Sequence, residues 1–66
     1  MERVRLNEKK IRIAMINGDL RTKDVAHNYG ASKQRIAAIT NSKAVTVETA
    51  DKLARALGVD VLEIIE

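Results

Sequence analysis

The sequence predicts an all-α protein, a compact bundle of five helices in one domain over residues 1–66. Residues 22–41 contain two short helical patterns with Gly30 between them, which is the arrangement of a helix-turn-helix. Further along, an apolar stripe at helical spacing predicts a buried fourth helix: Ala50, Leu53, Ala54 and Leu57. The chain has no Pro, and no alternating pattern indicates a strand. One compact helical unit is therefore the expected architecture.

The first predicted helix begins after Asn7, whose side chain can cap it, and ends at Asn17-Gly18. Residues 1–5 precede it and are expected to form a frayed basic arm. The residues expected to face the core are spaced by three and four: Ile11, Ala14 and Met15. Ile13 and Ile16 lie on the flanks of this face, so we expect both to be exposed.

The second predicted helix starts at Arg21 or Thr22, and propensity alone does not decide between them, although Thr is the better cap. Its apolar face is expected to comprise Val25, Ala26 and Tyr29. Gly30 can adopt the left-handed backbone that ends a helix, so the third helix can begin directly after it. His27, the one histidine of the chain, falls on the polar side and is expected to be solvated.

The third predicted helix spans residues 32–40, with Ser32 as its N-cap. Ile36 and Ile39 lie three apart and are expected to face inward. The opposite side is polar or small: Lys33, Gln34, Ala37, Ala38 and Asn41. That side is where a binding function would lie.

Near the end of the chain, Thr46 is expected to cap the fourth helix and Gly58 to end it. Asp60 and Glu63 form a capping-box pattern, which predicts a short fifth helix. This helix would carry four apolar side chains, too many for one core-facing stripe: Val61, Leu62, Ile64 and Ile65. We expect these residues to form a contact between two copies of the chain. The alternative is that they close the bottom of the core.

The net charge is +3 and is unevenly distributed. Residues 1–43 carry ten Lys and Arg against four Asp and Glu, whereas residues 44–66 carry two against five. A basic part that holds the helix-turn-helix is typical of a protein that faces phosphates, although lysine-rich surfaces also serve solubility alone. The chain has no Cys, no apolar run of membrane-spanning length and no apolar signal region, so we expect a cytoplasmic protein.

Catalysis is disfavoured, because the chain offers a single His, no Cys and no phosphate-binding glycine loop. Glu48 and Asp51 lie three apart, but acidic residues are expected in the first turn of a helix. We therefore expect no enzymatic activity, no cofactor, no metal, no membrane and no small-molecule substrate.

Small and apolar residues recur in an order that resembles the helix-turn-helix of the phage repressor family, of the Cro and C1 (XRE-like) type: Ala26, Gly30, Ile36 and Ile39. The resemblance covers roughly the span from Leu6 to Val59. It implies a lambda-repressor-like DNA-binding domain. Such a domain binds double-stranded DNA as a homodimer on a two-fold operator, through the recognition helix at residues 32–40.

The resemblance and the side-chain chemistry together predict two sets of DNA contacts. The base-reading set is Lys33, Gln34, Ala37 and Ala38. The phosphate-binding set is Thr22, Ser32, Arg35, Asn41 and Lys43. Gln can bond bidentately to adenine, Lys can donate to guanine, and an Ala methyl can contact thymine. Arg35 suits either set. The alternative interpretation of Lys33 and Gln34 is that they belong to a solvated helix face without a binding role.

The sequence departs from the family pattern at several positions. Thr22 replaces a glutamine that many relatives carry, and Ala38 replaces a longer polar side chain, so base contacts are expected to be fewer. Thr40 stands where relatives often place a glutamate that pairs with an arginine of the first helix. We expect Met15 or Ala14 to face it instead, which makes this link apolar.

The predicted function is a sequence-specific transcriptional regulator, a repressor of phage or mobile-element type. The alternative is a protein-binding helix-turn-helix, of antitoxin-like or adaptor kind, that docks a partner on exposed isoleucines: Ile13, Ile16, Ile64 and Ile65. Salt separates the two, because DNA binding releases counterions and weakens steeply as salt rises, whereas apolar docking responds little.

Overall fold

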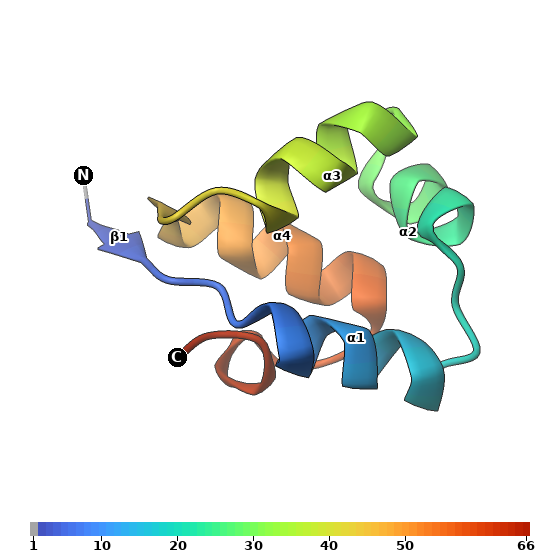
Figure 1. The fold of residues 1–66 in the computed structure, drawn as a ribbon, viewed down its shortest axis with the longest axis horizontal. Helices are drawn as coiled ribbons and strands as arrows, with labels where there is room; N and C mark the ends of the chain where they lie inside the picture. Colours follow the sequence, from blue (N-terminus) through green and yellow to red (C-terminus); the bar gives the residue numbers. More distant parts are fainter. Residues whose placement is uncertain (1) are drawn as a thin grey trace.

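The structure, a computed structural model, describes residues 2–66, in which four α-helices surround an apolar core (Figure 1). In chain order the elements are β1 (Arg3–Val4), α1 (Glu8–Asn17), α2 (Thr22–Tyr29), α3 (Lys33–Thr40), β2 (Val45–Thr46), α4 (Val47–Leu57) and the 3₁₀ turn η1 (Val61–Glu63). α4 packs mainly against α2 and also contacts α1 and η1, while α3 packs on α2. This arrangement leaves the far side of α3 free of the rest of the domain.

α4 supplies the centre of the core, which confirms the prediction from its apolar stripe. Ala50 and Leu53 are fully buried, and Ala54 and Leu57 are nearly so. The other core residues come from every helix and from both ends of the chain: Leu6, Ile11, Ala14, Val25, Ala26, Ile36, Ile39, Val45, Ala56 and Ile64. Every buried side chain within residues 2–66 is apolar, so packing rather than a buried polar network holds the domain together.

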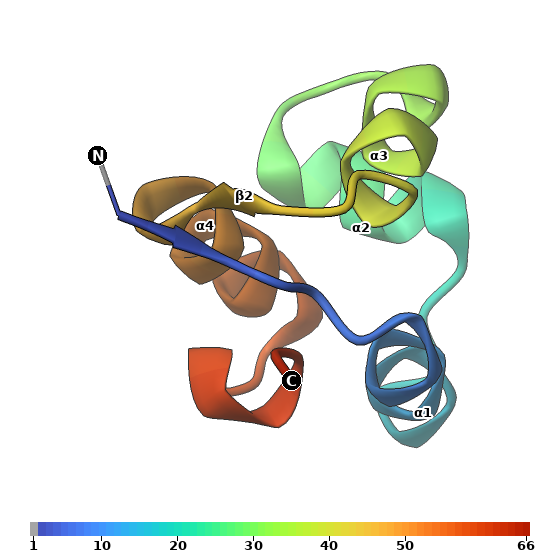
Figure 2. The ribbon, with the colours of Figure 1, turned by 60° about the vertical axis from the view of Figure 1, so that its left-hand side comes forward.

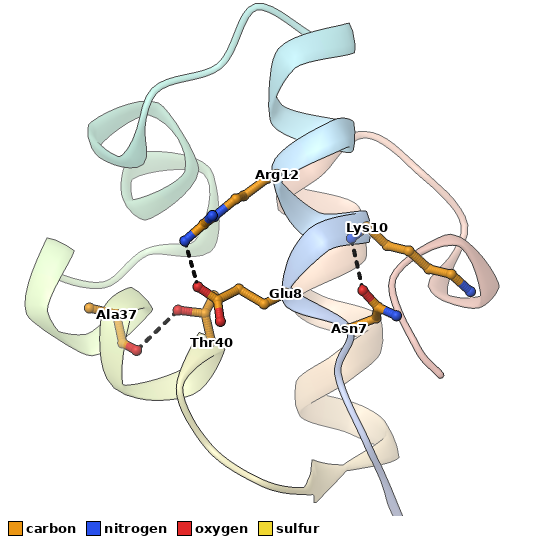
Figure 3. Close-up of polar contacts among 6 residues, drawn as sticks. All are labelled: Asn7, Glu8, Lys10, Arg12, Ala37 and Thr40. Carbon is orange, nitrogen blue, oxygen red and sulfur yellow. Dashed lines mark hydrogen bonds and ion pairs between the residues drawn. The ribbon is translucent and has the colours of Figure 1, made fainter.

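Three helix starts are capped as predicted, and each cap satisfies a backbone donor that the first turn leaves open. The side chains that accept these hydrogen bonds, at 3.0, 3.2 and 3.2 Å, belong to Asn7, Ser32 and Thr46. Figure 3 shows the first of them. At α2, Thr22 is the first helical residue, and the preceding Arg21 amide donates to the Asp24 carboxylate at 2.9 Å.

The prediction of a fifth helix is wrong, because a single 3₁₀ turn stands in its place. The capping pattern itself is present, since the Asp60 amide donates to the Glu63 carboxylate at 3.2 Å. The turn ends there because Ile64 enters the core, where it is fully buried. Its carbonyl accepts a hydrogen bond from the Asn7 amide at 2.8 Å, so the last residues run beside the N-terminal segment instead of continuing a helix.

The prediction of a frayed arm over residues 1–5 is corrected for the residues that the structure describes; Met1 lies outside them. β1 pairs antiparallel with β2, with Arg3 opposite Thr46 and Val4 opposite Val45 (Figure 2). Side chains alternate between the two sides of a strand. Val4 and Leu6 therefore pack on the core, while Arg3 and Arg5, which alternate with them, are exposed. This apolar side fixes the segment against the domain.

Candidate nucleic-acid interface

A turn at Gly30 joins α2 to α3. Its φ of 87° lies in the left-handed region, and an added Cβ would meet no atom within 4 Å, so the backbone conformation rather than space favours glycine. The amides of Gly30 and Ala31 both donate to the Ala26 carbonyl, at 2.8 and 3.0 Å, and close the end of α2. The buried side chains of the two helices are Val25, Ala26, Ile36 and Ile39. The turn and this packing orient α3.

The opposite side of α3 carries the predicted base-reading set, and all four side chains are exposed: Lys33, Gln34, Ala37 and Ala38. Within residues 2–66, no carboxylate lies within ion-pairing distance of Lys33. The surface therefore offers unengaged hydrogen-bond donors beside small methyl groups. Small side chains allow the backbone of α3 to approach another molecule closely.

The predicted phosphate-binding residues are exposed on both sides of this surface: Thr22, Ser32, Arg35, Asn41 and Lys43. Thr22 lines one cavity together with Ala37, whereas Asn41 and Lys43 follow the C-terminal end of α3. The Ser32 hydroxyl oxygen accepts a hydrogen bond from the Arg35 amide, and the Ser32 O–H can still donate a hydrogen bond to another group. The structure thus brings the two sets onto adjoining surface, and their roles toward DNA stay predictions.

A cavity of about 270 Å³ lies between α1 and the α2–α3 pair. Met15 and Thr40 both line it, and the Thr40 hydroxyl donates to the Ala37 carbonyl at 3.0 Å. Figure 3 shows that Glu8 of α1 points toward Thr40, a polar neighbour that sequence reasoning missed. Because Arg12 pairs with Glu8 at 2.8 Å, this carboxylate adds no unbalanced negative charge beside α3.

A second cavity, of about 390 Å³, lies at the C-terminal end of α3. Three separate parts of the chain line it: Arg5, Leu6, Glu8, Thr40, Asn41, Ser42, Lys43 and Glu66. We call it the α3-end groove. It brings Arg5 beside Asn41 and Lys43, both predicted to bind phosphates. Sequence reasoning missed Arg5, although the alternation of arginine with apolar residues over 3–6 was a signal for a strand with two outward cations.

The four C-terminal apolar residues do not share one surface. Leu62 is 72% exposed, whereas Val61 and Ile65 are half-buried. Ile64 is fully buried in the core of its own chain. This corrects both the expectation that Ile64 contacts a second copy and the alternative that it is an exposed docking residue. The predicted contact is reduced to the other three side chains.

Within residues 2–66, the titratable side chains outside α3 and the α3-end groove do not form a cluster that suggests a second site. His27 is exposed on α2, as predicted. Asp51 pairs with Arg55 one turn along α4 at 3.1 Å, and Glu48 lies in the first turn, where a carboxylate suits the helix dipole. No three His, Cys, Asp or Glu side chains in this part of the chain are placed to share a metal ion. None of its helices is long and apolar enough to cross a membrane.

Comparison with known families gives one match. The family model described as a Cro/C1-type HTH DNA-binding domain matches residues 10–66. The matched span includes all of α2, α3 and α4, and with them both predicted contact sets. No curated protein and no solved structure matches the chain. Arg5 precedes the matched span, so the family match does not extend to its place in the α3-end groove.

Proposed function

The chain belongs to the Cro/C1-type helix-turn-helix DNA-binding family, and from this premise we propose that it is a sequence-specific transcriptional regulator that reads DNA with α3. One observation carries the proposal. The inward residues Ile36 and Ile39 are buried, while every side chain of the predicted base-reading set is exposed on the other side of the same helix. An α-helix fits the major groove, where each base pair presents a distinct pattern of donors and acceptors.

Base reading is assigned to a small number of side chains on α3. Gln34 can bond bidentately to an adenine, and Lys33 can donate to a guanine. Ala37 and Ala38 can pack against a thymine methyl group. Only two of these four side chains are polar. We therefore expect each half-site to contain a short recognition sequence that includes a thymine contacted through its methyl group.

Phosphate contacts position the helix in the groove but carry no sequence information. Thr22, at the start of α2, contacts a phosphate of one DNA strand. Asn41 and Lys43, after α3, contact phosphates of the other strand. Ser32 and Arg35 complete the set near the N-terminal end of α3. This spacing supports a helix held at both ends while its middle reads bases.

The regulator acts as a homodimer on a two-fold operator, as a repressor of phage or mobile-element type. Two copies that meet through Leu62, with Val61 and Ile65 at its edge, would bury the exposed apolar side chain of η1. A two-fold pair of recognition helices reads half-sites about 34 Å apart, one turn of DNA. Leu62, at 72% exposed, is the observation that supports this contact.

Selection of bound duplexes from a random pool tests the proposal directly. We expect enrichment of one sequence, with two inverted half-sites spaced by about one helical turn. Affinity for that sequence should fall steeply as salt rises, because phosphate contacts release counterions. A pool that stays random after repeated rounds at low salt would contradict the proposal.

A second candidate is a protein-binding module, and the exposed flank of α1 supports it. Ile16 is 76% exposed and Ile13 is 47% exposed, as predicted from their positions. Such side chains can dock an apolar partner surface. This function predicts binding that responds little to salt and survives removal of the cations around α3.

A further inference from the structure

The N-terminal segment is held on both of its edges, and this fixes where Arg5 lies. On one side β1 pairs with β2. On the other side, Leu6 forms a bridge with Ile65, and the Arg5 carbonyl accepts a hydrogen bond from the Glu66 amide at 3.0 Å. Leu6, at 8% exposed, anchors the next position in the core. The backbone of Arg5 is therefore placed by the fold before any ligand arrives.

Strand geometry decides which way the Arg5 side chain faces. Since Leu6 and Val4 pack on the core, Arg5 lies on the opposite side of the segment. There it lines the α3-end groove with Asn41 and Lys43. Two cations and an amide thus border one open groove directly after α3, together with the carboxylates of Glu8 and Glu66. Glu8 is paired with Arg12 at 2.8 Å, which leaves Glu66 as the carboxylate that competes for Arg5.

The one partner of the Arg5 guanidinium within residues 2–66 is a weak one. Its Nη1 lies 3.9 Å from the Glu66 carboxylate, and the two side chains are 71% and 54% exposed. By contrast, Arg12 and Glu8 meet at 2.8 Å. An exposed pair at such a distance contributes little, because water and salt screen it. Arg5 can therefore leave Glu66 at small cost.

We propose that Arg5 is a further phosphate contact: it exchanges Glu66 for a DNA backbone phosphate that enters the α3-end groove beside Asn41 and Lys43. The guanidinium fork matches the oxygens of a phosphate, and a backbone held on two edges reduces the entropy lost on binding. Glu66 opposes this contact, because its carboxylate holds Arg5 and repels the phosphate. The inference rests on the proposed function of the chain in DNA binding.

Arg5→Gln, measured against salt on the selected duplex and on a random duplex, tests the contact. The slope of log affinity against log salt should become shallower by about one unit on both duplexes. Consequently, the loss of affinity should be about three- to fourfold larger at 50 mM than at 200 mM salt. Arg5→Lys keeps the charge and should keep the slope.

Glu66→Gln separates a phosphate contact from a merely structural ion pair. If Arg5 binds phosphate, Glu66→Gln should tighten DNA binding, and this gain should shrink in the Arg5→Gln background. If the pair only supports the fold, both variants should lower the melting temperature and the affinity together, which would overturn the proposal. Arg55 and Asp51 form the matched control pair, because neither lines the groove. Arg55→Gln and Asp51→Asn should leave the salt slope unchanged.

The outcomes also distinguish this inference from the proposed function. If the parent binds its selected duplex and Arg5→Gln keeps the parent's slope, the proposed function stands and the Arg5 contact is wrong. If the parent binds no duplex at low salt, both are wrong. A melting temperature of Arg5→Gln equal to that of the parent shows that a changed slope reports binding and not folding.

Discussion

α3 and α4 are neighbours in the chain and opposite in character. α4 buries five of its 11 residues, whereas α3 buries two of its eight. The apolar side of α4 lies at the centre of the core, and α3 uses its buried pair to attach a polar surface to that core. The difference places the centre of the core and the proposed recognition surface on separate helices. Substitutions should therefore affect one without the other.

Leu53→Ala should have the largest effect, and on stability alone. Leu53 is fully buried at the centre of α4, and its truncation should lower the free energy of unfolding by about 2–5 kcal/mol. This is a large share of the roughly 5–15 kcal/mol that a domain commonly holds. Thermal and urea melts measure it, with the exposed substitution Gln34→Ala as control. A melt of Leu53→Ala that overlays the parent's would show that α4 does not dominate the core.

Gln34→Ala should have the opposite pattern of effects: it should weaken recognition of DNA and leave the stability of the domain unchanged. Its side chain is exposed, so the melting temperature should stay at the parent's value. Affinity for the selected duplex should fall by about 1–3 kcal/mol, with relaxed discrimination at one base pair. Binding to a random duplex should hardly change. Unaltered selectivity would mean that a different face of α3 meets the bases.

Lys43→Ala should give a smaller effect that does not depend on sequence. As a phosphate contact, Lys43 should contribute equally to the selected and the random duplex. Its removal should make the salt dependence shallower by about one unit of log–log slope. Titrations at several salt concentrations measure both quantities. A loss confined to the selected duplex would reassign Lys43 from phosphate to base reading.

Leu62→Lys should have the smallest effect on one domain and act only between copies. Leu62 is 72% exposed, so folding and binding to a single half-site should persist. Cooperative occupancy of two half-sites should be lost, as measured by sedimentation and by titration of a two-site duplex. Ile16→Lys is the matched control, because Ile16 is as exposed but lies on α1. Loss of cooperativity in the control alone would move the contact to α1.

The helices were predictable from the sequence because their signals are local. The stripe of α4, the caps at Ser32 and Thr46 and the left-handed turn at Gly30 each depend on residues within one or two turns. The exposure of the base-reading set follows from the same periodicity, since the burial of Ile36 and Ile39 determines the opposite side. Periodicity does not reveal what that side binds, so the residue roles remain proposals.

The two ends of the chain were not predictable in the same way, because they depend on partners far away in sequence. β1 has two residues, and the alternation over residues 3–6 does not show which segment the strand pairs with; that partner is β2. Four apolar residues near the C-terminal end could not be divided between core and surface from their spacing. Packing decides that Ile64 enters the core and Leu62 does not. The position of Arg5 beside α3 follows from the same distant pairing.

The N-terminal segment, held between β2 and the C-terminal residues, also has a consequence for the order of folding. Its amide and carbonyl partners include Ile64 and Glu66, which are synthesised after all four helices, so these hydrogen bonds cannot form until the helices have been made. α2 contacts both α3 and α4 over shorter sequence separations, so these helices can assemble earlier. We expect refolding to show a fast helical phase and a slower closure of the ends. The groove beside α3 would then be the last part of the surface to form.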